Sequence, residues 1–413
     1  MRLRVSRYLR PVLLFLFAVF AFFSASSIAV AQSAFGLALI CFVILAISER
    51  HNPFVGPLRW FYLLVGIYVA WLFLSAAFSD TPLQSMLNLR EEWLFLIIPV
   101  GIYMFQDERR GDRLILVLMA GVTLASLNGI VQRFTGVDWI LGRQLHTVGE
   151  DFRSCGFFSY PLTYGNYMAT AALFCLGYAL SSFGRSRGWR RAFLVTVALL
   201  ALLATALANS RGPILALGVG LLVFGVVLHK ARYALVTLLV AVMVWVAASP
   251  DIAAQFRERL RTDVQLENVG GRLFIWNNSL KIIRDHPVTG IGRGNFELEY
   301  ARLLPDDISD DYKLTHAHCD VLDIAATAGI PGTAFYIALW CFTMVFLWRG
   351  IRSKRLSERY RGFCLAAFLA SAAFFVTSLT EATFADEEVR QLLMFTWAAG
   401  LSGRYEGRAE CDL

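Results

Sequence analysis

Long apolar stretches, separated by shorter polar ones, recur along the whole chain. Most are of membrane-spanning length, and apolar residues do not alternate with polar ones within them, which predicts transmembrane α-helices rather than barrel strands. The fourth stretch is short, and its helix can begin earlier, near Met86. The predicted segments are 12–30, 34–48, 58–78, 93–105, 113–132, 160–181, 192–208, 212–228, 233–249, 321–348, 362–380 and 389–402.

The composition agrees with this pattern. Of the 413 residues, 57% are hydrophobic and only 17% are charged. We therefore expect an all-α polytopic integral membrane protein with about twelve transmembrane helices. Membrane helices 1–9 are expected over residues 1–249, a large polar loop with amphipathic helices over 250–319, and helices 10–12 with a tail over 320–413.

Charge predicts the orientation of these helices. Lys and Arg favour cytoplasmic loops, so the arginines at positions 2, 4, 7 and 10 place the N-terminus inside. Every second loop is then cytoplasmic and basic, the C-terminal tail is also inside, and the alternate loops are richer in acid. The formal charge of +7 is explained in this way without a nucleic-acid partner. The cytoplasmic basic residues include Arg109, Arg110, Arg113, Arg185, Arg187, Arg190, Arg191, Lys230, Arg232, Arg349, Arg352, Lys354, Arg355, Arg359, Arg361, Arg404 and Arg408.

The first segment has a second interpretation. Basic residues, an apolar run and Ala29-Val30-Ala31 also fit a cleavable signal peptide. An uncleaved first helix is the favoured interpretation, and cleavage leaves the rest of the topology unchanged.

Arg211 is the first candidate for chemistry. It lies in the very tight outer turn Asn209-Ser210-Arg211-Gly212-Pro213, between two apolar helices. A guanidinium at the membrane edge is costly unless it is hydrated or paired. Since this turn faces outward, anion binding is favoured over a topological role, and Pro213 suits the first turn of a helix whose amides also favour anions.

The long outer loop contains two further features. Apolar residues at helical spacing predict an amphipathic surface helix over 272–284, with Arg272 on the face of Trp276 and Ile283 and therefore toward the membrane. There Arg272 is either an interfacial anchor or a ligand-binding residue. The glycine-rich run 286–296 is not a nucleotide loop and is expected to be a compact turn, unless Arg293 contacts ligand.

Two histidines, His316 and His318, precede the tenth predicted helix. With Asp320 and Asp323 nearby they invite a metal interpretation, but the ligand set is too sparse and no metal is expected. A histidine at this boundary can instead act as a general base, or simply begin the helix. The acidic stretch from Glu381 to Glu388 is expected to be solvated or to pair with the arginines, without a catalytic role.

These residues together resemble the O-antigen ligase family, within the O-antigen ligase/polymerase group of membrane glycosyltransferases. The resemblance covers essentially the whole chain in order and topology, and is most specific from 205 to 335. One position departs from the family pattern, because Cys319 stands where the ligases usually have Asn, Ser or Gln. The matching residues are Ser210-Arg211-Gly212-Pro213, Gly271-Arg272 with Trp276 and Ser279, Pro287 through Gly290-Ile291-Gly292-Arg293-Gly294 to Phe296, His318, and Gly329 with Gly332-Thr333.

The resemblance implies a fold similar to GT-C glycosyltransferases and an active site on the periplasmic face of the bacterial inner membrane. It implies transfer of O-antigen polysaccharide from undecaprenyl diphosphate to lipid A–core, by an inverting reaction without metal or cofactor. The implied roles are general base for His318 and binding of the diphosphate for Arg211 and Arg272, with Arg293 weaker and His316 as a further substrate contact. Membrane lipid is an implied partner.

The segment from Arg153 to Asn166 also resembles a family region. It adds Tyr164 and Asn166 as candidate sugar contacts, although an interfacial aromatic belt explains the tyrosines nearly as well. Cys155 and Cys319 both lie outside in this topology. A disulfide between them is open, because sequence does not set their distance.

Two other functions remain open. The same scaffold suits an O-antigen or exopolysaccharide polymerase, or a protein O-oligosaccharyltransferase, which differ only in acceptor. A transporter of lipid-linked glycan fits the number of helices, but its polar features are expected near the bilayer midplane rather than at the outer face. The identity of the glycan and the acceptor hydroxyl are not encoded in any visible motif.

Overall fold

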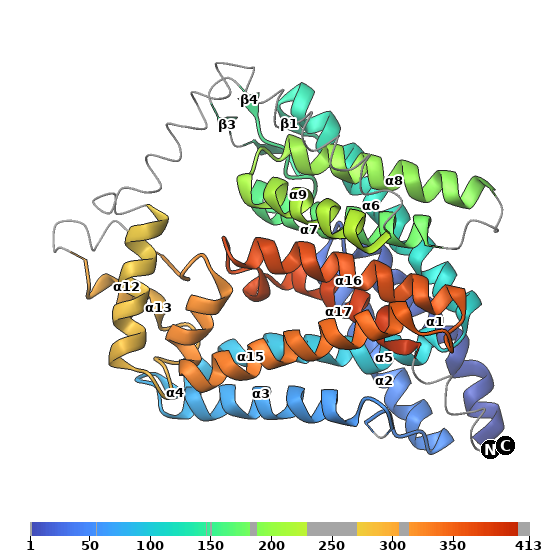
Figure 1. Cartoon of the computed structure of the whole chain (residues 1–413), viewed down its shortest axis with the longest axis horizontal. Helices are drawn as coiled ribbons and strands as arrows, with labels where there is room; N and C mark the ends of the chain where they lie inside the picture. The colour runs from blue at the N-terminus through green and yellow to red at the C-terminus, as the bar shows by residue number, and fades with distance from the viewer. Residues whose placement is uncertain are drawn as a thin grey trace.

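The computed structural model describes residues 2–54, 56–145, 147–148, 151–181, 188–228, 271–304 and 314–403. These residues form a bundle of long helices (Figure 1). The helices are α1 (Arg2–Phe23), α2 (Ile28–Glu49), α3 (Arg59–Ala77), α4 (Pro82–Asn88), the 3-10 helix η1 (Leu89–Leu96), α5 (Ile97–Phe105), α6 (Glu108–Thr135), α7 (Pro161–Leu180), α8 (Gly188–Leu207), α9 (Arg211–Leu228), α12 (Arg272–Asp285), α13 (Phe296–Ala301), α15 (Asp320–Arg352), α16 (Glu358–Ser378), the 3-10 helix η3 (Thr383–Ala385) and α17 (Glu387–Ser402).

Every apolar segment predicted within the described residues overlaps a helix, but the first, 12–30, runs past the end of α1 at Phe23 and into α2. The segment 93–105 is a 3-10 helix followed by the short, fully buried α5 rather than one regular helix. The predicted segment 233–249 and most of the long loop lie outside the described residues. Among the described helices, seven are long and apolar enough to cross a membrane, and α9 is a shorter apolar helix. The all-α membrane class is thereby confirmed.

Two short hairpins are the only strands among the described residues. Strand β1 (Val137–Asp138) pairs with β2 (Arg143–Gln144), and β3 (Thr147–Val148) pairs with β4 (Asp151–Phe152), both antiparallel. They lie in the connection between α6 and α7, at the same end of the bundle as α12.

The two ends of the bundle differ in their loops. At one end the loops are basic, and ion pairs join Arg10 to Glu49 at 2.9 Å and Arg359 to Glu108 at 2.9 Å. The opposite end carries α4, α12, α13, the start of α15 and the turn between α16 and α17 (Figure 1). We call this the loop-rich end.

Helix α1 is built into the bundle. Phe17 and Phe20 are fully buried, and just beyond the helix the hydroxyl of Ser24 lies 2.7 Å from that of Tyr167 on α7. The backbone of Phe22 lies so close to α6 that a side chain at Gly121 would collide with its carbonyl oxygen. These contacts join α1 and the residues after it to α6 and α7.

Helix α15 is kinked where the glycine-rich turn meets it. Gly329 has φ +71°, and a Cβ there would lie 1.9 Å from the carbonyl oxygen of Val288. Around the kink the amides of Ile291 and Gly292 donate to carbonyls of α15, both at 2.9 Å. The turn therefore donates hydrogen bonds to carbonyls that the kink leaves without helical partners. This agrees with the compact turn expected for the glycine-rich run 286–296.

Helices α12 and α13 form a small second core over the start of α15. Ile275 and Ile282 of α12, Phe296 and Tyr300 of α13, and Ala326 of α15 are buried in it. Arg272 lies at the start of α12, and its side chain forms an ion pair with a carboxylate on the loop after α16. That its side chain points toward the membrane stays a prediction, and the charge pair supplies part of the compensation that a guanidinium at a membrane edge requires.

A buried ion pair anchors α17 to η1 near the loop-rich end. The Arg390 side chain is 1% exposed and donates to both carboxylate oxygens of Glu92, one of them at 3.1 Å. Its guanidinium also lies 4.4 Å from the ring centroid of Phe384. Two charges removed from water in this way are tolerated only because they are paired.

Replacement of Arg390 alone by Leu is expected to lower the free energy of unfolding by about 3–5 kcal/mol, since Glu92 is left as an unpaired buried charge. Replacement of both residues by Leu is expected to cost less than either single change. Thermal unfolding of the detergent-solubilised protein measures this. A double variant less stable than both single variants would contradict the prediction.

Candidate active site

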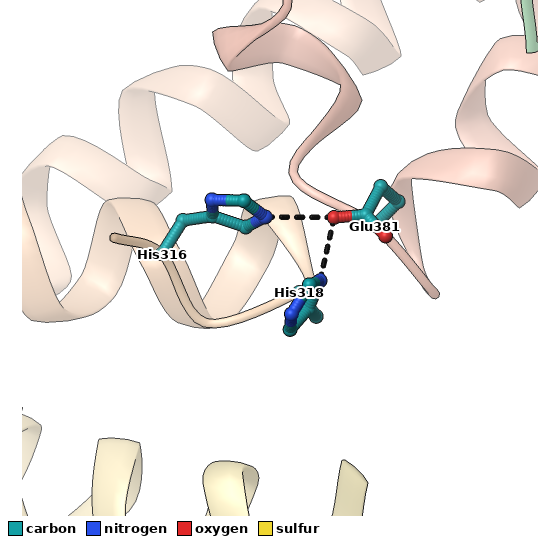
Figure 2. Close-up of side chains that lie close together, drawn as sticks. All are labelled: His316, His318 and Glu381. Carbon is teal, nitrogen blue, oxygen red and sulfur yellow. Dashed lines mark hydrogen bonds and ion pairs between the residues drawn. The ribbon is translucent and has the colours of Figure 1, made fainter. Parts of the chain in front are cut away.

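Three separate segments bring charged side chains together at the loop-rich end. They are the start of α12, the residues before α15 and the loop between α16 and η3. Glu381, in the last of these, is at the centre of the cluster (Figure 2). Its carboxylate is contacted by both histidines and by Arg272.

One oxygen of Glu381 is shared by two imidazoles. Oε1 lies 2.8 Å from Nε2 of His316 and 2.6 Å from Nδ1 of His318, as Figure 2 shows. The two rings approach edge to face, with centroids 4.5 Å apart. Oε2, the second oxygen, accepts a hydrogen bond from Arg272 at 3.3 Å.

Arg272 connects this cluster to α12. Its second terminal nitrogen donates to the backbone carbonyl of His318 at 3.2 Å. His318 has φ +51°, a left-handed conformation that is uncommon for a residue with a side chain. The guanidinium therefore contacts both the carboxylate and the strained backbone that positions the imidazole.

These contacts change proton affinities in the cluster. Burial tends to raise the pKa of Glu381, but hydrogen bonds from His316 and His318 and the charge of Arg272 outweigh it and hold that pKa well below its usual range. For His316, burial tends to lower the pKa, and the hydrogen bond and charge of Glu381 overcome it, so its pKa is raised. Glu381 is therefore anionic at neutral pH.

An anionic Glu381 also determines the tautomer of His318. A carboxylate only accepts hydrogen bonds, so the facing Nδ1 of His318 carries the proton. In the neutral ring Nε2 then holds the lone pair, and it makes no hydrogen bond to any described residue. This nitrogen has the chemistry of a general base. In His316 both ring nitrogens already have partners, Glu381 and the hydroxyl of Thr315.

Arg211 approaches the cluster from α9. It is exposed at the first residue of that helix, and the next residue, Gly212, lies against Thr380, where an added Cβ would meet the hydroxyl at 2.7 Å. Thr380 directly precedes Glu381. The turn before α9 is held by Arg153, which donates to Ser210 at 2.6 Å. Arg211 therefore begins its helix beside the loop that carries Glu381.

The remaining predicted site residues lie in structural environments. Arg293 pairs with Glu91 at 3.4 Å. Tyr164 is fully buried, and its hydroxyl donates to the carbonyl of Ala125 at 3.2 Å. Asn166 is also buried, and its side-chain oxygen has no hydrogen-bond partner.

The donor atoms of His316, His318 and Glu381 lie within 4.8 Å of one another, a spacing that suits a metal ion. Two imidazoles and a carboxylate are also a donor set that binds zinc. Here the three groups already satisfy one another by hydrogen bonding, and Arg272 places a positive charge against the same carboxylate. The three side chains therefore form a hydrogen-bonded cluster with one another and with Arg272.

Comparison with known families identifies the region that holds most of these residues. A family model described as O-antigen ligase matches residues 196–337. This part of the chain is therefore similar to O-antigen ligases. The matched region runs from within α8 to within α15, and it includes Arg211, Arg272, His316 and His318. No curated protein matches the chain.

Glu381 lies outside the matched region, and from the sequence it belongs to an acidic run expected to be solvated or paired with the arginines, without a catalytic role. The available signal was its position, since it begins the acidic loop that faces the same side as the arginines and histidines. The expected pairing of this run with the arginines is confirmed for Glu381 and Arg272. Cys155 and Cys319 are both free thiols, so the disulfide that the sequence left open is absent from the structure.

The cluster predicts a specific pH dependence of stability. Glu381 contributes stability above its usual pKa of 4.5 and loses that contribution as pH falls, because its folded pKa is lowered. His316 contributes below its usual 6.5 and loses its contribution as pH rises through its raised folded pKa. Together they stabilise the fold most between these values.

The difference in unfolding temperature between wild type and Glu381→Gln is therefore expected to be largest at about pH 5–6 and to shrink on both sides. Thermal unfolding from acid to alkaline pH measures it. The exposed Glu358→Gln serves as the control and should show no such maximum. A difference for Glu381→Gln that is constant across the range would contradict the assignment of the cluster as an ionised network.

Proposed function

We propose that this protein is an O-antigen ligase, which transfers O-antigen polysaccharide from undecaprenyl diphosphate to lipid A–core. The match to the family supports a glycosyltransferase-like enzyme of lipopolysaccharide biosynthesis. The observation that carries the proposal is the contact of Arg272 and His318 with one carboxylate, at the end of the bundle opposite its basic loops.

In the proposed reaction His318 is the general base. The acceptor hydroxyl gives its proton to Nε2 as its oxygen bonds to the anomeric carbon of the donor sugar. The bond from that carbon to the diphosphate oxygen breaks, and its electron pair leaves with the diphosphate. Glu381 neutralises the resulting imidazolium through Nδ1, which keeps the proton on the histidine. A single displacement of this kind inverts the anomeric centre.

The arginines stabilise the leaving group. Negative charge grows on the diphosphate during the displacement, and guanidinium groups meet it with charge-assisted hydrogen bonds in place of a metal ion. Arg272 is held near the base by His318 and Glu381, and Arg211 begins α9 beside the loop that carries Glu381. His316, whose pKa is raised, adds positive charge for substrate binding. Arg293, with its own acidic partner, is a weaker third contact.

The same proposal includes the topology. The chain crosses the bacterial inner membrane about twelve times in a GT-C-like arrangement, with both termini in the cytoplasm. The segregation of the arginine-rich loops to the end opposite the cluster supports this orientation, because such loops remain cytoplasmic. The candidate site then faces the periplasm, where lipid-linked glycan and acceptor both lie in the outer leaflet.

Reconstitution of the purified protein with undecaprenyl-diphosphate-linked glycan and lipid A–core tests the reaction. We expect Arg272→Ala to lower the rate roughly 10²–10³-fold and His318→Ala roughly 10²–10⁴-fold. Arg284→Ala, on the same helix with a side chain 78% exposed, is the matched control and should retain the wild-type rate. Wild-type transfer by both Arg272→Ala and His318→Ala proteins would reject the assigned chemistry.

Loss of the gene separates ligase from the alternatives. A ligase mutant is expected to make lipopolysaccharide with core but without O-antigen, and to accumulate lipid-linked polymer. Gel electrophoresis of lipopolysaccharide measures this. Core that still bears one repeat unit would indicate a polymerase instead, and absence of covalent transfer by the purified protein would indicate a transporter.

A further inference from the structure

The first turn of α15 carries two buried carboxylates that the proposed mechanism does not use. Asp320 is 2% exposed and Asp323 is 4% exposed. Burial of a carboxylate is unfavourable unless its oxygens accept hydrogen bonds. Their partners are backbone amides of the two loops that form the catalytic cluster.

Asp323 holds the histidine loop. Its Oδ1 accepts a hydrogen bond from the amide of Ala317 at 3.1 Å. Ala317 is fully buried and lies directly between His316 and His318. The backbone amide of Asp323 donates in turn to the carbonyl of Cys319 at 2.8 Å. The loop is thereby bonded to the helix on both sides of His318, whose left-handed backbone needs such a constraint.

Asp320 holds the loop that carries Glu381. Both of its oxygens accept from the amide of Phe384, at 3.0 and 3.1 Å, and Oδ2 also accepts from the hydroxyl of Tyr336 at 3.1 Å. Phe384 is buried under the guanidinium of Arg390. The end of this loop is therefore fixed to the same helical turn as the histidine loop.

We propose that Asp320 and Asp323 are positioning residues that set the distance between the imidazole of His318 and the carboxylate of Glu381. One rigid turn of helix holds both loops, one through each carboxylate. This turn therefore sets the position of one loop relative to the other. The importance of this distance for transfer rests on the proposed function. The structural part of the proposal is tested separately, by the accessibility of Cys319.

The kinetic test compares Asp323→Ala with Asp323→Asn. Ala removes the acceptor for the amide of Ala317, whereas Asn keeps an acceptor oxygen in the same place. We expect Asp323→Ala to lower kcat about 10²-fold with KM within roughly threefold of wild type, since displaced catalytic groups cost rate rather than binding. Asp323→Asn is expected to restore most of the rate. Equal loss in both variants would overturn the proposal.

A matched variant controls for loss of stability. Thr343→Val removes another buried hydrogen bond within α15, to the carbonyl of Leu339, farther along the helix. It should keep the wild-type kcat per folded protein. Asp320→Ala should lower kcat about as much as Asp323→Ala does. The fold-decrease in kcat of the double variant should be smaller than the product of the two single fold-decreases, because both changes disturb one contact. A double variant whose fold-decrease in kcat equals that product would overturn the shared role.

The accessibility test does not require transfer activity. Cys319 is 7% exposed and joins the histidine loop to α15. Its alkylation by a soluble maleimide, located by mass spectrometry, is expected to be slow in wild type, Asp323→Asn and Thr343→Val. It should be at least about tenfold faster in Asp323→Ala, because the loop opens when its amide is released. Unchanged labelling in Asp323→Ala would overturn the proposal even if the proposed function holds.

Discussion

The candidate site depends on one carboxylate whose negative charge is shared among three cationic or polar partners from distant parts of the chain. Glu381 receives hydrogen bonds from Arg272 at the start of α12 and from His316 and His318 in the segment before α15. A partly buried carboxylate binds such donors strongly because water competes poorly for it. The interaction therefore joins the loops and selects the tautomer of the His318 imidazole.

The helical bundle makes this cluster possible by supplying fixed points close to the surface. The ion pair of Arg390 with Glu92, the stacking of Arg390 on Phe384 and the bonds of Asp320 all lie just beneath the loops. Buried polar groups that are paired in this way are held firmly, since leaving the pairing exposes a buried group without a partner. Because the loops are bonded to these buried groups, they can hold His318 in its uncommon backbone conformation.

This arrangement suits the departure of a lipid diphosphate without a metal ion. A guanidinium is always charged and can form two parallel hydrogen bonds to an anion, whereas a bound cation would compete for the carboxylate that orients the base. Because Arg272 contacts the backbone of His318, the proposed leaving-group contact and the proposed base are directly connected. The proposed ligase thus combines acid–base chemistry and charge stabilisation in one small cluster.

The sequence alone determined the membrane helices, the basic loops and several candidate residues. Apolar run length reports helix position directly because the bilayer imposes it. Arg211, Arg272 and His318 could be found for two reasons. Charged or titratable residues beside apolar segments are costly, and each of the three lies in a short sequence motif. Only the tertiary structure revealed Glu381 as the centre of the site, because it bonds residues 63 and 109 positions away. The partner of Arg272 and the burial of Tyr164 were also decided by packing, since periodicity defines the faces of a helix but not what each face meets.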